Sequence, residues 1–511
     1  MASFLVITEY SPLAFLAAAA AALVTVQIVR ATYKFPGPRS AAISRKWQAK
    51  IVDKGFPEKE YKRLHREFGT RALRIGPNHL HISDTSLYKV IYSQVNAFPK
   101  EKAFYDTFES HHTTFSETDA QLHKQRRRLL SPLFSRSGVS KLEPLILEKV
   151  KETIEKVQRI SQRGPINAWP AFRCMTIDII SEFSFGTCIN LINEDPDTFS
   201  SEYLAAMEIA SDVPFLRYYS TTQRLLAKFI PLSVAANFNP VLSQLQRLVG
   251  IIGHSYDNFT HRTNDSRFPV LFDNLQAIPP DMQKAEAINT FIAGSDTTAF
   301  TLVTALCHIL RLPEVEKTLT KSLDEIFGEH QATPSLLQLE QTKYLRACIN
   351  EALRLAMSVP GILPRVVPTR SQPFVVDGKV VPPGTVVGMS AYTMNTDPQI
   401  WGQDAHSFNP DRWLGPNAKE LETHLCTFSK GARQCIGINV ASFTYTFKEY
   451  TELCGISKAR VYMSSPDHDD MDLYIALRKL DENGRELWHK NIPIEDLPEG
   501  TTVEDIPNHN V

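Results

Sequence analysis

A lone cysteine in a glycine-flanked loop is the feature of this sequence best suited to chemistry. Cys435 lies between Gly431 and Gly437, with Arg433 and Phe428 preceding it. The glycines allow a tight backbone turn around the thiol. A thiolate in such a loop can ligate a metal while loop N–H groups donate hydrogen bonds to its sulfur, Phe428 shields it and Arg433 pairs with a carboxylate of a bound group. A buried structural cysteine is the alternative, but the coincidence of five residue types favours the metal-binding interpretation.

The composition argues against several other classes of protein. The 511 residues carry 55 basic and 56 acidic side chains, so the near-neutral net charge of −1 gives no reason to expect a nucleic-acid partner. Seven cysteines occur without a Cys-x-x-Cys pair, which argues against a disulfide framework or a zinc ribbon. A chain of this length is able to bury a large apolar core.

The cysteine segment resembles the haem-binding signature of cytochrome P450 monooxygenases. Together with Ser131–Gly138 it is similar to fungal members from secondary metabolism, over roughly residues 1–440. The resemblance implies haem b as cofactor, with Cys435 as the axial ligand of the iron. It also implies that a set of loop residues binds the cofactor and that a separate reductase supplies electrons from NADPH. The loop residues are Phe428, Gly431, Arg433 and Gly437.

A second motif, residues 293–298, lies inside an apolar helix expected from Pro280 to about Pro313. Gly294 lacks side-chain bulk, and the hydroxyl of Thr297 is able to disturb the helical hydrogen bonds, so the sequence predicts a groove here. Taken alone, the motif fits a polar helix face equally well. The resemblance implies the family's oxygen-activation site, with Asp296 and Thr297 as the catalytic residues that deliver protons.

A third set of residues is predicted to have a structural role. Glu351 and Arg354 share one side of a helix expected over 343–357, although such a pair also arises by chance. With Arg412, in Phe408–Trp413, they resemble the family's Glu–Arg–Arg lock, a charge-assisted triad that holds the cysteine loop.

A basic run at 123–128, taken alone, has two interpretations: a solvated helix face or a patch that binds nucleic acid. The resemblance instead implies that His123, in place of the usual tryptophan, and Arg127 bind a haem propionate. Arg365 resembles a further propionate-binding arginine. The remaining basic residues, with Lys430, would suit docking of an acidic reductase domain.

The chain that positions these residues begins with an apolar run, Leu13–Val29. It is long enough for one membrane-spanning helix, and the basic residues Arg30, Lys34 and Arg39 follow it. A secretory signal is the alternative, but its basic residues would precede the run. We therefore expect a single-pass anchor in the endoplasmic reticulum membrane with the catalytic domain in the cytosol.

The body is predicted to be mainly α with a minor β-sheet, as in the cytochrome P450 fold. Residues 70–84 read as strand, turn and strand, and residues from about 120 to 330 as helices, including Lys141–Ile160. Short strands return at Phe374–Val376 and Val380–Val381.

The last part of the chain departs from the family. Residues 441–511 carry 14 acidic and seven basic residues, a net of −7, so the first 440 residues carry +6. Ser442–Phe447 favours a strand, and Leu473–His489 reads as a hairpin with an Asn-Gly turn. This tail resembles part of the carboxy-terminal β-sandwich of CocE/NonD-type acyl hydrolases, but no Gly-x-Ser-x-Gly elbow occurs in the chain.

We therefore expect three parts: an anchor over 1–34, a haem-thiolate domain over 35–440 truncated in its last helix, and a β-rich fragment over 441–511 from a gene fusion or a mis-joined gene model. The predicted function is monooxygenation of a lipophilic metabolite of terpenoid or polyketide type. The alternatives are an impaired or inactive fusion product, and a haem-dependent isomerase or dehydratase that needs no reductase. The expected partners are the reductase, the substrate and the membrane, and no nucleic acid.

Overall fold

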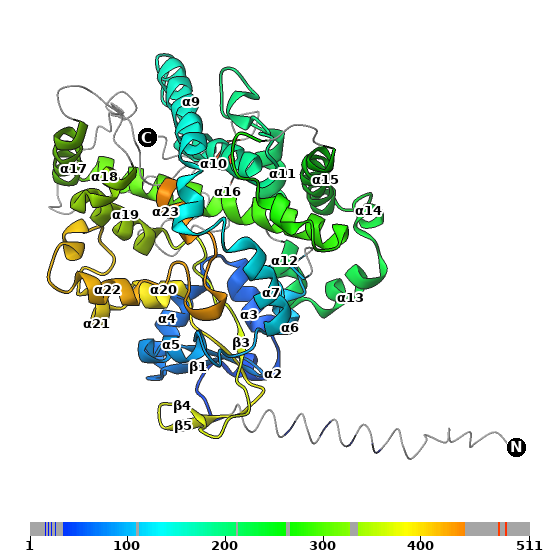
Figure 1. The fold of residues 1–511 in the computed structure, drawn as a ribbon. Helices are drawn as coiled ribbons and strands as arrows, with labels where there is room; N and C mark the ends of the chain where they lie inside the picture. The colour runs from blue at the N-terminus through cyan, green and yellow to red at the C-terminus, as the bar shows by residue number, and fades with distance from the viewer. Residues whose placement is uncertain are drawn as a thin grey trace, which may run out of the picture.

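One long helix, α16 (Pro280–Arg311), runs through the middle of the molecule (Figure 1). The structure is a computed structural model that describes residues 34–108, 112–210, 213–261, 266–327 and 336–444, with a few isolated residues towards each end. The closest neighbour of α16 is α10 (Ala168–Phe185), whose side chains are buried on nearly every face of the helix. A helix that is buried on nearly every face is typical of a protein core. The main core is therefore built around α10 and α16.

Further helices surround this pair. Asp119 accepts hydrogen bonds from the N–H groups of Gln121 and Leu122 and so fixes the start of α7 (Ala120–Leu130), which carries the basic run. The helices before α16 are α2 (Arg39–Ile43), α3 (Lys46–Asp53), α4 (Pro57–Glu67), α5 (Tyr88–Ile91), α6 (Lys102–Tyr105), α7 (Ala120–Leu130), α8 (Arg136–Ser140), α9 (Glu143–Ser161), α11 (Glu202–Ala210), α12 (Val213–Tyr219), α13 (Thr221–Phe229), α14 (Leu232–Ala235) and α15 (Pro240–Thr260). Those after it are α17 (Pro313–Phe327), α18 (Leu336–Gln341), α19 (Lys343–Ala356), α20 (Ala391–Asn395), α21 (Pro398–Trp401), α22 (Ala418–His424) and α23 (Ile438–Thr444).

A small sheet lies on the other side of α16 from α9 and α10 (Figure 1). Its strand order is β1-β2-β6-β3. β1 (Ala72–Gly76) is antiparallel to β2 (His79–Ile82), β2 is parallel to β6 (Val386–Gly388), and β6 is antiparallel to β3 (Arg365–Val366). A separate hairpin pairs β4 (Phe374–Val376) with β5 (Lys379–Val381). The sheet thus joins the strand of Arg365, through β6, to strands almost 300 residues earlier in the chain.

The predicted mainly helical fold with small sheets is confirmed. The predicted helix after Pro279 is α16, the predicted 343–357 helix is α19, and the strand–turn–strand at 70–84 is β1 and β2. The predicted strand at Ser442–Phe447 is wrong over its described residues, because α23 continues to Thr444. Asn439 donates to the carbonyl of Phe134, 2.8 Å away, and Val440 and Ala441 pack on the main core, so tertiary contacts override the β propensity.

The two ends of the chain are described only in part. The predicted anchor, Leu13–Val29, lies outside the described residues except for four isolated positions. Among the described residues, one helix is long and apolar enough to cross a membrane, and it is the central helix α16. In the tail, β7 (Lys479–Leu480) pairs antiparallel with β8 (Glu486–Leu487), within the predicted hairpin, and the rest of 445–511 lies outside the described residues.

Candidate active site

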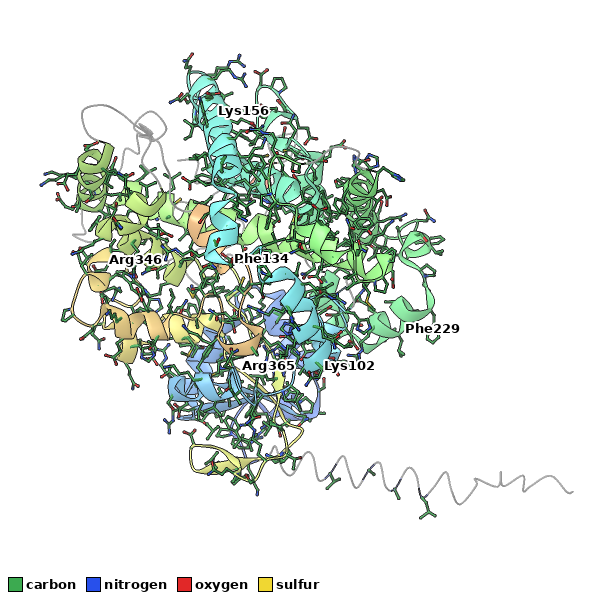
Figure 2. The ribbon with its side chains drawn as sticks, in the orientation of Figure 1. Lys102, Phe134, Lys156, Phe229, Arg346 and Arg365 are labelled. Atoms are coloured by element: carbon green, nitrogen blue, oxygen red, sulfur yellow. The ribbon has the colours of Figure 1, made fainter. Side chains whose placement is uncertain are left out.

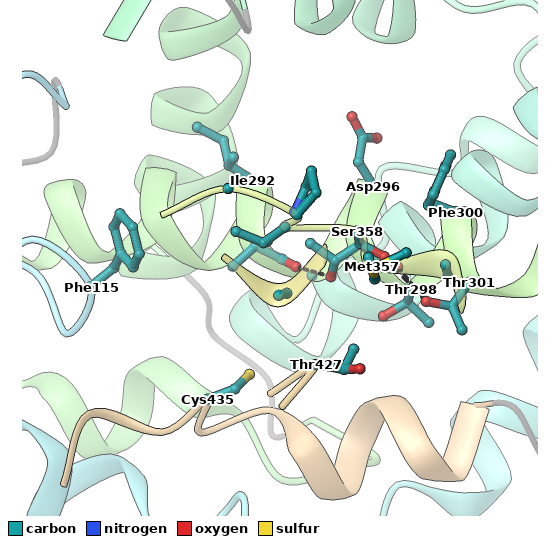
Figure 3. A pocket seen from close by; sticks show the side chains of 18 of the residues that line it. Phe115, Ile292, Asp296, Thr298, Phe300, Thr301, Met357, Ser358, Thr427 and Cys435 are labelled. Carbon is teal, nitrogen blue, oxygen red and sulfur yellow. Dashed lines mark hydrogen bonds between the residues drawn. The ribbon is translucent and has the colours of Figure 1, made fainter. Parts of the chain in front are cut away.

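A cavity of about 2300 Å³ lies between α16 and the cysteine loop, and Cys435 lines it. Small-molecule pockets commonly measure roughly 300–1,000 Å³. The thiol of Cys435 is accessible from this space, although the residue lies deep within the protein. Figure 3 shows Cys435 on one side of the cavity and residues of α16 on the other. The cavity therefore has room for a large planar group on the thiol and for a second molecule beyond it.

The loop around Cys435 is held by backbone geometry. The Cys435 N–H donates to the carbonyl of Phe428 at 2.9 Å, which closes the loop. Gly431 has φ 74°, and a Cβ there would lie 2.3 Å from the carbonyl oxygen of Ser93, so only glycine fits. Burial raises the pKa of the Cys435 thiol, while the N–H of Gly437 and the charge of Arg127 act to lower it. The loop thus offers its sulfur the amide donor that the sequence predicted.

The opposite wall is formed by α16. The hydroxyl of Thr297 donates to the carbonyl of Ala293 at 2.8 Å, while the carbonyl of Thr297 accepts from Ser358 at 2.8 Å and from Thr301 at 3.1 Å. The helical assignment is nevertheless continuous through these residues. The sequence did not predict the part played by Ser358, whose loop after α19 is tied to α16 by this bond.

Gly294 has a different role from the predicted one. A Cβ at this position would lie 2.6 Å from Cγ1 of Ile180 on α10. The missing side chain therefore lets α10 and α16 pack closely, and it does not create an opening in the helix.

Asp296 forms an ion pair on the α10 side of the cavity. Arg173 donates to its two carboxylate oxygens at 2.7 and 3.2 Å. Arg173 is almost fully buried, whereas about a third of the Asp296 side chain is exposed. Figure 3 shows Asp296 directed away from Cys435. No local pattern predicts this pairing, because the two residues are 123 positions apart.

One end of the cavity is lined by positive side chains that bind neutral acceptors. Arg433 donates to the carbonyls of Glu117, Thr118 and Asp119, Arg127 to that of Gln434, and Lys100 to that of Phe115. Arg365 donates to the hydroxyl of Tyr105 at 2.6 Å. The four cations of this basic cluster are Lys100, Arg127, Arg365 and Arg433. Within the described part of the chain, none of them forms an ion pair with a carboxylate.

Burial and the repulsion between neighbouring cations lower the pKa values of this basic cluster. Burial, with Arg365, Arg433 and Arg127, holds the pKa of Lys100 well below its usual range. Burial and Arg365 lower the pKa of Arg433 to about 10. Burial and the neighbouring cations lower the pKa of His123 to about 3, so its imidazole is neutral at pH 7. A buried positive cluster without a counter-charge favours an anionic ligand. The sequence indicated every member except Lys100, which no motif marks.

The predicted lock residues form their own cluster outside the cavity. The carboxylate of Glu351, fully buried, accepts from Arg354 at 2.7 and 2.9 Å and from Arg412 at 3.0 Å. It also accepts from the N–H of Asn409 and from the indole of Trp413, both at 2.9 Å. All acceptor positions of Glu351 are thus used, as a buried carboxylate requires.

This cluster is connected to the cysteine loop through Asn395. Its side-chain amide donates to the carbonyl of Arg354 and to the hydroxyl of Thr427, both at 3.1 Å. Thr427 in turn donates to the carbonyl of Leu353 at 2.7 Å. The lock residues do not reach Cys435 directly, but this short network fixes the segment that leads to it.

Apolar side chains supply most of the remaining cavity wall. They come from the 100–115 region, from α16 and from the loop after α19, and Figure 3 shows several of them. They include Phe104, Phe115, Ile292, Phe300, Val359 and Ile362. Such a wall selects an apolar molecule through the hydrophobic effect.

Comparison with known proteins agrees with this geometry. The family model for cytochrome P450 matches residues 36–446. The model for the X-Pro dipeptidyl-peptidase C-terminal non-catalytic domain matches residues 399–502, in line with the predicted hydrolase-like tail.

Three curated relatives show the same kinship at about 30% identity. Cytochrome P450 monooxygenase hkm5 of Aspergillus hancockii is 30% identical over 80% of this chain and 81% of its own. Cytochrome P450 monooxygenase macH of Penicillium terrestre is 30% identical over 80% and 83%. Cytochrome P450 monooxygenase sol6 of Alternaria solani is 30% identical over 79% and 89%.

Proposed function

The chain belongs to the cytochrome P450 family, whose cofactor is haem b and whose electrons come from a separate reductase, and we propose that it inserts one oxygen atom from O₂ into a lipophilic metabolite of terpenoid or polyketide type. An NADPH-dependent reductase would supply the electrons. The observation that carries the proposal is a single cavity that has Cys435 on one side, Thr297 on the other and a mostly apolar wall between them.

The residues present fit haem. The thiolate of Cys435 would ligate the iron, with the N–H of Gly437 near its sulfur and Phe428 and Gly431 shaping the loop. Two propionates would supply the negative charge that the basic cluster lacks. We assign this role to Arg127, Arg365 and Arg433, to His123 as a neutral donor, and to Lys100.

We expect Arg127→Leu to release haem about tenfold faster, because one charge-assisted hydrogen bond contributes about 1.5–3 kcal/mol. Transfer of haem to an excess of a haem-free acceptor protein would measure the rate. Arg128→Leu is the matched control, since Arg128 is exposed on the same helix. Equal rates for the two variants would contradict the assignment.

The residues of α16 would control protons. Bound haem supplies the binding and activation of O₂. We propose that the hydroxyl of Thr297, which bonds a helix carbonyl in this structure, donates a hydrogen bond into the cavity during turnover. Asp296, held by Arg173 and partly exposed, would pass protons from solvent towards that hydroxyl.

Reconstitution with a reductase, NADPH and terpenoid or polyketide probes would test this function. We expect oxygenated product in the full chain, and we expect Thr297→Ala to divert most of the NADPH consumed to peroxide or water. Coupling should fall on the order of a hundredfold, at the lower end of the range for positioned proton donors. Arg173→Met should leave haem in place and also lower coupling, because Asp296 loses its anchor. Turnover without a reductase would contradict the monooxygenase proposal.

We propose that the membrane is a partner through the apolar run 13–29, with the domain in the cytosol at the endoplasmic reticulum. Two exposed aromatic side chains, at the end of α13 and in the turn after α14, support membrane contact: Phe229 and Phe238 are 80% and 85% exposed, and Phe229 lies at the outer edge of the molecule (Figure 2). Release of the full chain from membranes by alkaline carbonate would contradict the anchor.

The reductase would bind near the cysteine loop. Arg128 and Lys124 are exposed on α7, the helix whose Arg127 contacts that loop, and Lys430 precedes it. A basic surface at this place suits an acidic partner. Reductase turnover insensitive to salt would contradict this assignment.

We propose that residues 441–511 are a hydrolase-like fragment joined to a shortened oxygenase domain. The second family match covers residues 399–502 and so includes most of this tail, and it overlaps the cytochrome P450 match over 399–446. Sequencing of the transcript would separate a true fusion from a mis-joined gene model.

A further inference from the structure

A group of buried polar side chains lies at another part of the cavity wall, apart from the cysteine and the basic cluster. Gln48 on α3, Glu58 on α4 and His79 on β2 all line the cavity, and each is 3% exposed or less. Oε1 of Gln48, Oε2 of Glu58 and both ring nitrogens of His79 find no hydrogen-bond partner among the described residues. Buried polar atoms are costly when unpaired, so several together in one cavity indicate a missing ligand.

The position of Glu58 in the first turn of α4 does not account for its burial. A carboxylate there interacts favourably with the helix dipole, but an exposed carboxylate does so too. Glu60, in the same turn, shows the ordinary arrangement: it is partly exposed and accepts from Arg63 at 2.8 Å. Glu58 has one oxygen without a partner and no ion pair among the described residues. The contrast points to a role for Glu58 towards the cavity.

The carboxylate also lies within reach of the reaction centre. Its Oε1 is 3.3 Å from the place where a Cβ of Gly361 would stand. Three residues earlier in the same loop, Ser358 donates to the carbonyl of Thr297. The Cα atoms of Ser358 and Gly361 are at most about 11 Å apart, since consecutive Cα atoms are 3.8 Å apart. A metabolite of moderate length is therefore able to contact both Glu58 and the α16 wall.

The chemistry of the unpaired atoms defines the ligand. An ionised carboxylate and an amide oxygen are acceptors only, and a neutral imidazole adds one further acceptor and one donor. We propose that this polar group binds a hydroxyl group on a lipophilic substrate, at the end away from the oxidised carbon, with Glu58 as the specificity-determining residue. This inference rests on the proposed function, because it assumes that the substrate occupies this cavity.

The test compares two probes that differ in one hydrogen-bond donor, 1-dodecanol and its methyl ether 1-methoxydodecane. The full-length holoenzyme is placed in lipid nanodiscs at pH 8.5, and calorimetry and the haem spectrum report the dissociation constants. We expect the alcohol to bind about tenfold more tightly than the ether. In Glu58→Met the ratio should fall to about one, whereas Glu60→Met should keep the ratio of the wild type. Partitioning of the probes into lipid cancels when ratios are compared between variants.

The pH dependence gives a second readout of Glu58. Burial raises the pKa of Glu58 to about 7. The neighbouring titratable groups are Tyr61 and Tyr219, and Arg45 lies near Tyr219. Protonated Glu58 is able to donate to an ether oxygen, so the preference for the alcohol should shrink at pH 6. Because the acid has a raised pKa, the wild type should also gain thermal stability relative to Glu58→Met as the pH falls from 8 towards 5.

Equal affinity of the wild type for the two probes, or an unchanged preference in Glu58→Met, would overturn the inference. A failure of the proposed function looks different. In that case haem or turnover is absent while the preference measured by calorimetry still follows Glu58. Destabilisation of Glu58→Met at pH 8 would also count against the inference, because it would show that the carboxylate already has structural partners.

Discussion

Cys435→Ala should abolish the thiolate-type Soret band of the reduced carbon-monoxide complex and all oxygenated product. The thiol of Cys435 lies on the side of the cavity opposite α16 (Figure 3), and no group of three or more metal-ligating side chains occurs among the described residues. Without the sulfur, the chain would lack the thiolate that would hold haem and supply the electron donation on which oxygen activation depends. The measurement is the difference spectrum of membranes that contain the full chain.

Cys426→Ala is the control for this experiment. Cys426 also lines the cavity, but burial raises its pKa to about 12, and its sulfur lies 3.2 Å from Oδ1 of Asn395. Its thiol is therefore neutral at pH 7, and the variant should keep the band. A band that survives in Cys435→Ala, or one that is lost equally in both variants, would contradict the assignment of the ligand.

The same spectrum tests the join to the tail. The helix after the cysteine loop is described to Thr444, and Val440 and Ala441 pack on the main core. If the thiolate band is present in the full chain, the haem site forms with this carboxy-terminal sequence in place. If the wild type shows no band, the full chain does not build the site, whatever its motifs predict.

The sequence predicted the parts of the site that depend on local patterns. A glycine-flanked cysteine, a polar motif inside an apolar helix and a Glu/Arg pair three residues apart are visible without a structure, and the structure brings the first two to one cavity. Residues that act across long separations carry no such pattern. Arg173 meets Asp296, and Ser358 meets Thr297, only because the fold places their elements side by side.

The errors have the same physical origin. Ser442–Thr444 carries β-forming residues, yet the segment is helical because the preceding residues pack against the core. Gly294 was interpreted from its helix alone, whereas its role is set by Ile180 on the neighbouring helix. Lys100 and Glu58 are charged residues that sequence reasoning assigns to the surface, and only the fold shows that both face the cavity.

Glu351→Gln should prevent accumulation of folded holoprotein. The substitution removes the only carboxylate that pairs with Arg354 among the described residues, and Arg354 is fully buried. Breaking a buried pair by removing one partner costs about 3–5 kcal/mol, against a total folding stability of roughly 5–15 kcal/mol. We expect most of the protein to be lost at growth temperature and little carbon-monoxide signal per chain. Thermal unfolding of the remaining fraction should show a lowered midpoint.

Glu422→Gln separates this effect from the general loss of an ion pair. Glu422 pairs with Arg346 at 2.7 Å, but both side chains are well exposed, and such pairs contribute about 0–1 kcal/mol. A large loss in Glu351→Gln with none in Glu422→Gln would show that burial, and not pairing as such, sets the cost. Comparable stability of the two variants would contradict the lock. Haem that is lost while the thermal midpoint is unchanged would place the effect in the network around Asn395 and Thr427, because this network joins the lock to the segment that leads into the cysteine loop.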